Sequence, residues 1–170
     1  GLTIIGNVES VNGLGDINGD GLDDFIIGSH DDDSSNGVDS GSAYIIYGQT
    51  SYSDDINLLD LGTLNTEGFK INGEVAGDFL GREVSRAGDI NGDGINDIVV
   101  SAHLANGETG ASYVVFGDTS FSSEFNLALL DGSTGFKING EVAGARLGRY
   151  ATSAGDVNGD GIDDLVVSAA

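Results

Sequence analysis

One segment of the sequence recurs at a fixed spacing, and this repetition constrains the fold more than any other feature. The octapeptide GFKINGEV at residues 68–75 returns unchanged at residues 135–142, 67 residues further along. A weaker copy, GLTIIGNV, occupies residues 1–8 in the same register. Repeats of this kind indicate a chain built from successive supersecondary units that pack on their neighbours. The predicted units are residues 1–67, 68–134 and, as a partial unit, 135–170.

Each unit has the pattern of short strands separated by glycine-rich turns. In the second unit we expect strands at 69–72, 82–87, 97–102 and 112–116. The third of these is apolar enough to be buried on both faces of a sheet. No stretch shows a convincing helical period, and residues 125–130 are only a mild candidate. Four strands per unit predict an all-β fold of β-propeller-type blades, each with four antiparallel strands, about two and a half blades in this chain.

Charge and composition exclude several classes of protein. The 170 residues carry 28 acidic and 6 basic side chains, a formal net charge of −22, so a nucleic-acid partner is not expected. The absence of Cys excludes disulfides and thiolate metal sites. No apolar run approaches the roughly 18 residues of a membrane span. Because the sequence opens with Gly, we expect a processed or excerpted segment of a longer protein.

Three similar nonapeptides lie at matching places in the units, and we name them loop 1 (residues 16–24, DINGDGLDD), loop 2 (89–97, DINGDGIND) and loop 3 (156–164, DVNGDGIDD). Each has an oxygen-bearing side chain at positions 1, 3, 5 and 9 and glycine at position 6. An apolar residue at position 7 can offer only its carbonyl oxygen. Alternate side chains of one tight loop that converge on a point are typical of a cation site.

The donor set favours calcium over other metals. Calcium takes six to eight hard oxygen ligands and tolerates flexible geometry, whereas magnesium demands a stricter octahedron and zinc prefers His or Cys. An EF-hand would need Glu at position 12, where this chain has Ile27, Val100 and Val167, and flanking helices instead of strands. A dockerin-like pair of loops is disfavoured for the same reasons. Hydrated Asx turns without metal are the alternative interpretation.

These residues resemble a known family, the FG-GAP repeat of integrin α-subunit β-propellers and their bacterial relatives. The Asp loops followed by an apolar strand carry the resemblance, together with Phe79-Leu80-Gly81, Ala87-Gly88-Asp89, Leu147-Gly148 and Ala154-Gly155-Asp156. Arg146 departs from the pattern, because it stands where the second unit has Phe79. The Gly-Ala-Pro segment of the repeat is also missing.

The resemblance implies three Ca²⁺ ions. Their side-chain ligands would be Asp16, Asn18, Asp20 and Asp24 in loop 1, Asp89, Asn91, Asp93 and Asp97 in loop 2, and Asp156, Asn158, Asp160 and Asp164 in loop 3. The backbone carbonyls of Leu22, Ile95 and Ile162 would complete the sites.

The remaining polar residues have plainer interpretations. His30 and His103 occupy equivalent repeat positions, where we expect packing or hydrogen-bonding roles. The acidic run at residues 31–33 is expected to be a solvated loop. We expect Arg82, Arg86, Arg146 and Arg149 to pair with the acidic surface. No nucleophile elbow or spare carboxylate pair suggests an active site.

Together these features predict a non-enzymatic, calcium-stabilised FG-GAP β-propeller segment with a structural or adhesive role in an extracellular or cell-surface protein. Its protein or glycan ligand cannot be read from the sequence. Two alternatives stay open. The chain could self-associate through open blade edges into a filament or ring, or it could be an accessory repeat region of a larger secreted hydrolase.

Overall fold

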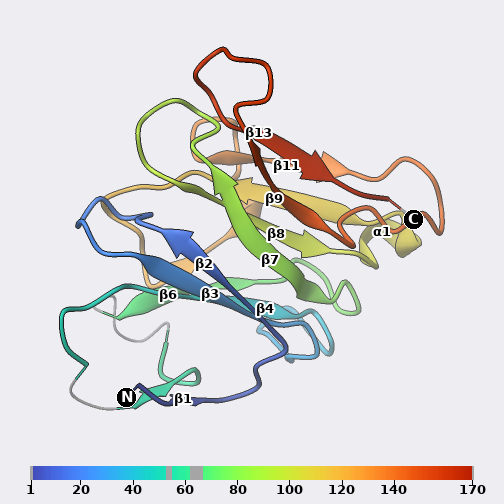
Figure 1. Cartoon of the computed structure of the whole chain (residues 1–170). Helices are drawn as coiled ribbons and strands as arrows, with labels where there is room; N and C mark the ends of the chain where they lie inside the picture. Colours follow the sequence, from blue (N-terminus) through green and yellow to red (C-terminus); the bar gives the residue numbers. More distant parts are fainter. Residues whose placement is uncertain (1, 53–54, 62–66, 170) are drawn as a thin grey trace.

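The computed structural model describes residues 2–52, 55–61 and 67–169, and these residues are folded almost entirely as β-sheet (Figure 1). The first five strands are β1 (Ile4–Ile5), β2 (Ser10–Gly15), β3 (Asp24–Ser29), β4 (Ser42–Ile46) and β5 (Ile56–Asn57). The next five are β6 (Gly68–Asn72), β7 (Leu80–Gly88), β8 (Asp97–Ala102), β9 (Ala111–Val115) and β10 (Glu124–Phe125). The last three are β11 (Gly135–Asn139), β12 (Ala151–Gly155) and β13 (Asp164–Val167). The two short helices are α1 (Ala105–Glu108) and the 3₁₀ turn η1 (Leu127–Leu129). The predicted all-β class is confirmed.

Two larger sheets form the body of the molecule. The first has the strand order β10-β6-β4-β3-β2 and the second β11-β9-β8-β7; β12 with β13, and β1 with β5, form two-stranded sheets. All neighbours from β2 to β6 and from β7 to β11 run antiparallel, whereas β10 adds to β6 in parallel. These sheets have the strand arrangement of partial β-propeller blades.

Each larger sheet is completed by a strand from the following sequence repeat. β6, at the start of the second repeat, pairs with β4 of the first, and β11, at the start of the third, pairs with β9 of the second. The expected strands of the second unit are present as β6, β7, β8 and β9, but β6 lies in the neighbouring sheet. Sheets and sequence repeats are therefore offset by one strand.

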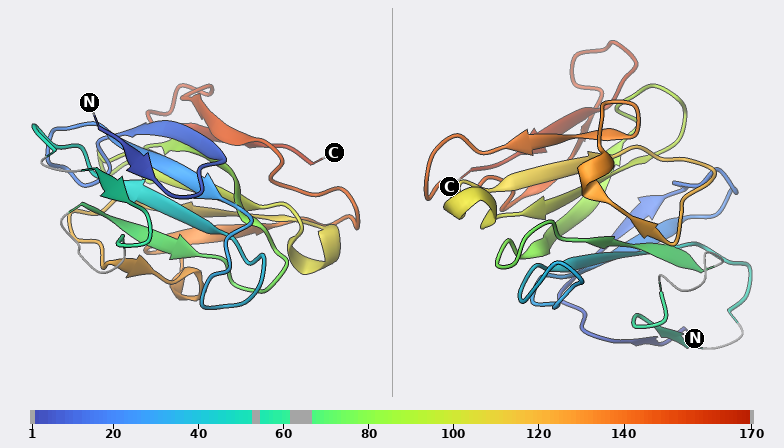
Figure 2. Two further views of the ribbon diagram at one scale, coloured as in Figure 1. Left: turned by 90° about the horizontal axis from the view of Figure 1, so that it is seen from below. Right: turned by 180° about the vertical axis from the view of Figure 1, so that it is seen from behind.

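β7 packs between its neighbours and joins the sheets. It lies against β2 and β3 on one side and against β12 on the other, an arrangement that the two views in Figure 2 also show. Apolar side chains from both larger sheets form the main core, including Ile26, Ile45, Phe69, Ile98 and Tyr113.

Alternation along the strands places successive side chains in different cores. In β3, Ile26 belongs to the main core, while Ile27 packs with Ile46 and Ile56 on the other face. In β8, Val99 instead joins the smaller core beneath β12 and β13. All six residues of β8 are buried, which confirms the sequence prediction of a strand covered on both faces.

Candidate metal centre

The three Asp loops occupy equivalent places in the fold. They connect β2 to β3, β7 to β8, and β12 to β13, at the same end of the sheets (Figure 1). Each is preceded by an irregularity in strand pairing, at Gly13/Gly15, Arg86/Gly88 and Ser153/Gly155. Such bulges re-aim the chain at the end of a hairpin. The repeat therefore reproduces the bend that leads into each loop as well as the loop sequence.

The aspartate at position 1 organises each loop by accepting hydrogen bonds from the loop backbone. Asp16, Asp89 and Asp156 each accept from the N–H groups at positions 4, 5 and 6, with N···O distances of 2.6–3.2 Å. In the exposed loop 3, these bonds, led by the one from Gly161, hold the pKa of Asp156 below its usual value.

Glycine at positions 4 and 6 permits this fold of the backbone. In loop 2, Gly92 has φ +76° and Gly94 has φ +89°, in the left-handed region that other residues enter at a cost. The corresponding glycines of loops 1 and 3 have φ between +76° and +91°. A Cβ at Gly94 would meet no atom within 4 Å, so conformation, and not space, requires glycine there.

The side chains at positions 3 and 5 lie next to each other in every loop. Asn91 Oδ1 accepts a hydrogen bond from the Asp93 N–H at 2.9 Å, and Asp93 Oδ1 accepts from the Ile95 N–H at 2.8 Å. The same two bonds recur in loop 1 and loop 3. Each loop thus holds its position 3 and position 5 oxygens by bonds that leave lone pairs available to a cation.

The aspartate at position 9, at the start of the strand that follows the loop, accepts a hydrogen bond from the loop backbone. Asp24, Asp97 and Asp164 each accept from the N–H at position 2 of their own loop, at 2.9 Å. The other oxygen of Asp24 accepts from the Gly48 N–H, and that of Asp97 from the Gly117 N–H. Both N–H groups follow the third strand of a larger sheet, and Asp164 has no such bond among the described residues.

Burial separates the position 9 carboxylates from the others. Asp97 is fully buried, and this burial, together with the charges of Asp93 and Asp89, raises its pKa to about 6. The hydrogen bonds from the Gly117 and Ile90 N–H groups act in the opposite direction. Burial likewise raises the pKa of Asp24. Negative charge held at these positions is thus energetically unfavourable without a compensating cation.

The residues present fit a hard cation. Each loop offers only oxygen donors, and no Lys or Arg in the described ranges pairs with a loop carboxylate. The carboxylate oxygens at positions 1, 5 and 9 of a loop do not all lie within 4.8 Å of one another in any of the three loops. The predicted carboxylate ligands thus share one short loop but lie farther apart than around a bound ion.

Backbone bonds join each loop to the next, a feature that the sequence analysis did not foresee. The Asn96 N–H of loop 2 donates to the Asp16 carbonyl of loop 1 at 3.3 Å. The Asp163 N–H of loop 3 donates to the Asp89 carbonyl of loop 2 at 3.0 Å. Both bonds run from position 8 to position 1.

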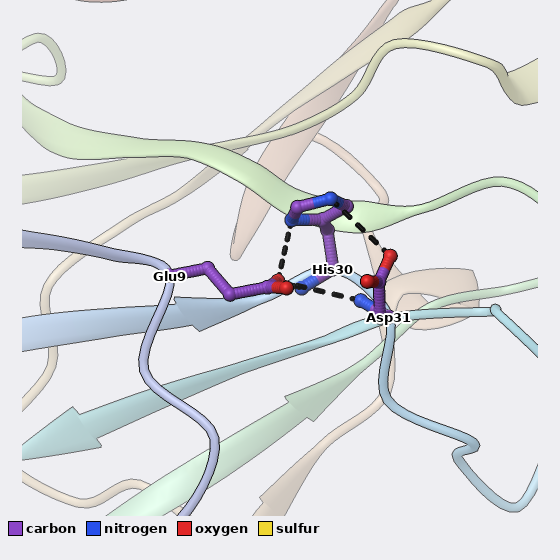
Figure 3. Close-up of side chains that lie close together, drawn as sticks. All are labelled: Glu9, His30 and Asp31. Atoms are coloured by element: carbon purple, nitrogen blue, oxygen red, sulfur yellow. Dashed lines mark hydrogen bonds and ion pairs between the residues drawn. The ribbon is translucent and has the colours of Figure 1, made fainter.

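A separate cluster of potential ligands surrounds His30. Among the described residues, Glu9, His30 and Asp31 are the three His, Asp or Glu side chains whose ligand atoms lie within 4.8 Å of one another. Figure 3 shows the imidazole between the two carboxylates, with Nδ1 toward Glu9 and Nε2 toward Asp31 at 3.3 Å. Glu9 Oε2 also accepts from the His30 backbone N–H. Because the two ring nitrogens face different carboxylates, we interpret the cluster as one that positions the imidazole.

The expectation that all four arginines pair with the acidic surface is wrong. Arg146 donates to Glu108 Oε2 from Nη2 at 2.6 Å and from Nε at 3.1 Å. Arg82, Arg86 and Arg149 form no ion pair or side-chain hydrogen bond with any other residue in the described ranges. Burial raises the pKa of the adjacent Glu83, and the charge of Arg82 acts against this rise without an ion pair between the two side chains, a distinction that the charge balance of the sequence cannot reveal.

The sheet order and the Asp loop at the same hairpin of each sheet are the features that the predicted resemblance to FG-GAP repeats implies. Residues 82–115 and 148–170 match the model of the FG-GAP repeat family. The predicted resemblance is confirmed.

Curated relatives are integrin α subunits. Integrin alpha-PS5 of Drosophila melanogaster is 39% identical over 102 residues, which cover 58% of this chain and 9% of that protein. Integrin alpha-2 of Mus musculus is 30% identical over 64% of this chain, and integrin alpha-4 of Xenopus laevis is 30% identical over 59%. The matched region is 9% of each relative's length. In the described part of the chain, no helix is long and apolar enough to cross a membrane.

Proposed function

We propose that this chain is a calcium-stabilised FG-GAP propeller segment that serves as a structural or adhesive module of an extracellular or cell-surface protein. The FG-GAP repeats and the similarity to integrin α subunits support an adhesion-type role. The carboxylates that could take part in chemistry are concentrated in the Asp loops. This concentration favours a module without catalytic activity. The observation that carries the calcium proposal is the recurrence of one oxygen-donor loop, with the same internal hydrogen bonds, at three equivalent hairpins.

Each proposed Ca²⁺ would be held by one loop. The ligands are the side chains at positions 1, 3, 5 and 9 and the carbonyl at position 7, as the sequence predicts. Calcium would supply positive charge where three carboxylates of one short loop repel one another. Because consecutive loops share a backbone hydrogen bond, an ion in one loop would also order the neighbour's position 1 residue.

The test is the calcium dependence of stability and stoichiometry. We expect EDTA to lower the melting temperature strongly, excess CaCl₂ to restore it, and titration calorimetry to count three Ca²⁺ per chain. Equal concentrations of MgCl₂ should restore much less, because magnesium demands stricter geometry. A melting temperature that is the same in EDTA and in calcium would contradict the calcium proposal.

Two aspartates of loop 1 provide a matched pair of variants. Asp20→Asn removes a proposed ligand charge but keeps an oxygen to accept the Leu22 N–H, so the calcium-free fold should persist. Asp23→Asn removes the same charge from an exposed side chain outside the proposed ligand set. We expect the first variant to reduce the stoichiometry from three to two and the second to keep three. Equal effects of the two variants would show that general acidity, and not a site, attracts the ion.

A further inference from the structure

A cationic pocket lies at the end of the sheets opposite the Asp loops. Its volume is about 280 Å³, and it is lined by three arginines, both histidines of the chain, Phe79 and Leu104. The arginines are Arg82, Arg146 and Arg149. His30 directly follows β3 and His103 directly follows β8, while Arg82 lies near the start of β7, so the pocket is formed where neighbouring sheets meet.

The charge in this pocket is opposite to that of the molecule. The chain has only 6 Lys and Arg against 28 acidic residues, yet three of the six line one pocket. No Asp or Glu of the described ranges lines it. Glu9 and Asp31 contact His30 from outside the lining, and Glu108 pairs with Arg146. The guanidinium groups of Arg82 and Arg149 form no ion pair or hydrogen bond within the described part of the chain, and the neighbouring Glu83 interacts with Arg82 only through its charge, so both groups can donate to a ligand.

Repeat symmetry brings these groups together. Arg82 and Arg149 are 67 residues apart, the spacing of the repeat, and Phe79 and Arg146 have the same relation. His30 and His103 follow equivalent strands of adjacent sheets. The pocket therefore consists of equivalent positions from successive repeats, and a basic residue at position 146 in place of an aromatic one adds charge to it.

His103 supplies an unsatisfied polar atom at the same place. Its Nδ1 is buried and has no hydrogen-bond partner among the described residues, which is uncommon in folded proteins. Burial, together with the positive charges of Arg82, His30, Arg146 and Arg149, lowers the pKa of His103 to about 4. The imidazole ring lies 6.4 Å from the Phe79 ring, and that of His30 lies 6.0 Å from it on centroid distances. A bound anion would offset the positive potential that these groups create.

We propose that this pocket binds a tetrahedral oxyanion, the sulfate or phosphate group of a small ligand. Guanidinium groups form charge-assisted hydrogen bonds with such oxygens in a fork geometry, and several donors from different strands suit a dianion better than a single carboxylate. The site is distinct from the Asp loops in position and in charge, and it does not depend on the calcium proposal.

The test uses inorganic sulfate, which stays soluble with millimolar calcium. Titration calorimetry on the full chain at pH 7 is run at a constant ionic strength of about 0.15 M, where the long-range field of the acidic surface is screened beyond about 8 Å. We expect saturable binding of one sulfate per chain. The double variant R82Q/R149Q should bind at least about tenfold more weakly, since it removes two charge-assisted donors.

Arg86 provides the matched control. It lies on β7 like Arg82, is exposed like Arg82, and is outside the pocket lining. Arg86→Gln removes the same charge from the chain and should leave sulfate affinity within about twofold, whereas R82K/R149K should recover part of the loss because it restores charge without the fork. Circular dichroism melts of every variant establish that each one is folded.

Two further ligands test which chemical group the pocket recognises. Galactose 6-sulfate that binds more tightly than inorganic sulfate would support an ester on a sugar as the natural ligand, and equal affinity would support the free ion. Acetate that binds as tightly as sulfate would overturn the tetrahedral preference. The proposal as a whole fails if the wild-type chain does not bind sulfate, or if R82Q/R149Q and Arg86→Gln weaken binding equally.

Discussion

The aspartate at position 9 of each loop has a structural role that does not require a metal. Asp97 is buried and accepts backbone hydrogen bonds with both carboxylate oxygens, from Ile90 at 2.9 Å and from Gly117 at 2.9 Å. One bond closes its own loop, and the other holds the chain that leaves β9. Asp164 occupies the same position in loop 3 but accepts only the Val157 N–H among the described residues.

This difference predicts unequal effects of the same substitution. Asp97→Asn replaces one acceptor by an amide donor, which leaves one buried N–H without a partner and should cost about 1–3 kcal/mol of unfolding free energy. Asp164→Asn, which lies in a less buried site and keeps an acceptor for Val157, should cost less than about 1 kcal/mol. Urea unfolding in EDTA measures both without metal. Equal losses would contradict the structural role assigned to Asp97.

At the scale of elements, glycines set the distance between neighbouring sheets. Gly28 of β3 and Gly81 of β7 face each other across the contact between the first two sheets. A Cβ on Gly28 would overlap the Gly81 carbonyl oxygen, and one on Gly81 would overlap that of Ser42. Gly148 is in the corresponding place in the next repeat, where a Cβ would lie 2.7 Å from the Ser101 Cβ. Close approach of two backbones thus requires glycine at position 81, whereas at position 148 a Cβ would meet the side chains of Ser101 and Ser112.

Gly81→Ala should therefore lower the free energy of unfolding by more than the cost of placing alanine in a left-handed backbone conformation. Gly77→Ala is the matched control, because Gly77 has φ +80° against +92° for Gly81 and open space around its Cβ position. The control should lose roughly 1 kcal/mol from the left-handed conformation. Gly81→Ala should lose about 1–3 kcal/mol beyond that, since neighbouring backbone must move. Thermal or urea unfolding of both variants checks this, and indistinguishable losses would rule out a packing role for Gly81.

The sequence predicts the elements better than their partners. Alternation and turn residues predict β7, β8 and β9 to within about two residues at their ends, because these signals are local. The shared hydrogen-bond pattern of the three Asp loops follows from their common sequence in the same way, and the ligand set stays a prediction. The sequence did not predict that β6 and β11 pair with strands of the preceding repeat. Pairing between strands that are distant in the sequence depends on how all the sheets are arranged in space. The pocket around Arg82 and Arg149 was missed for the same reason.

At the scale of the whole molecule, the two larger sheets share one core. Ile26 and Ile45 of the first sheet belong to the same buried cluster as Ile98 and Tyr113 of the second. Burial of apolar surface between sheets is the main source of stability. We therefore expect the two sheets to unfold as one cooperative unit.

Native-state hydrogen exchange can test this coupling. Ile98→Ala removes fully buried side-chain volume from β8 and should lower the exchange free energy of the slowest amides in β8 by about 2–5 kcal/mol. The slowest amides of β3, in the other sheet, should fall by the same amount. Val166→Ala, at a side chain that is 56% exposed on β13, is the control and should change neither. A loss confined to β8 would show that the sheets open separately.

Because the sheets are offset from the sequence repeats by one strand, a fragment that contains one complete sheet does not coincide with one sequence repeat. A piece cut at the repeat boundaries, residues 68–134, would keep β6 without the sheet it completes and would take β11 away from β9. The segment that keeps the second sheet whole runs from β7 to β11, residues 80–139. Gene duplication of a repeat would meet the same condition, because every new copy must complete the sheet of the copy before it. We therefore expect a substitution in β6 or β11 to change the stability of the sheet that the preceding repeat forms, and not only that of its own repeat.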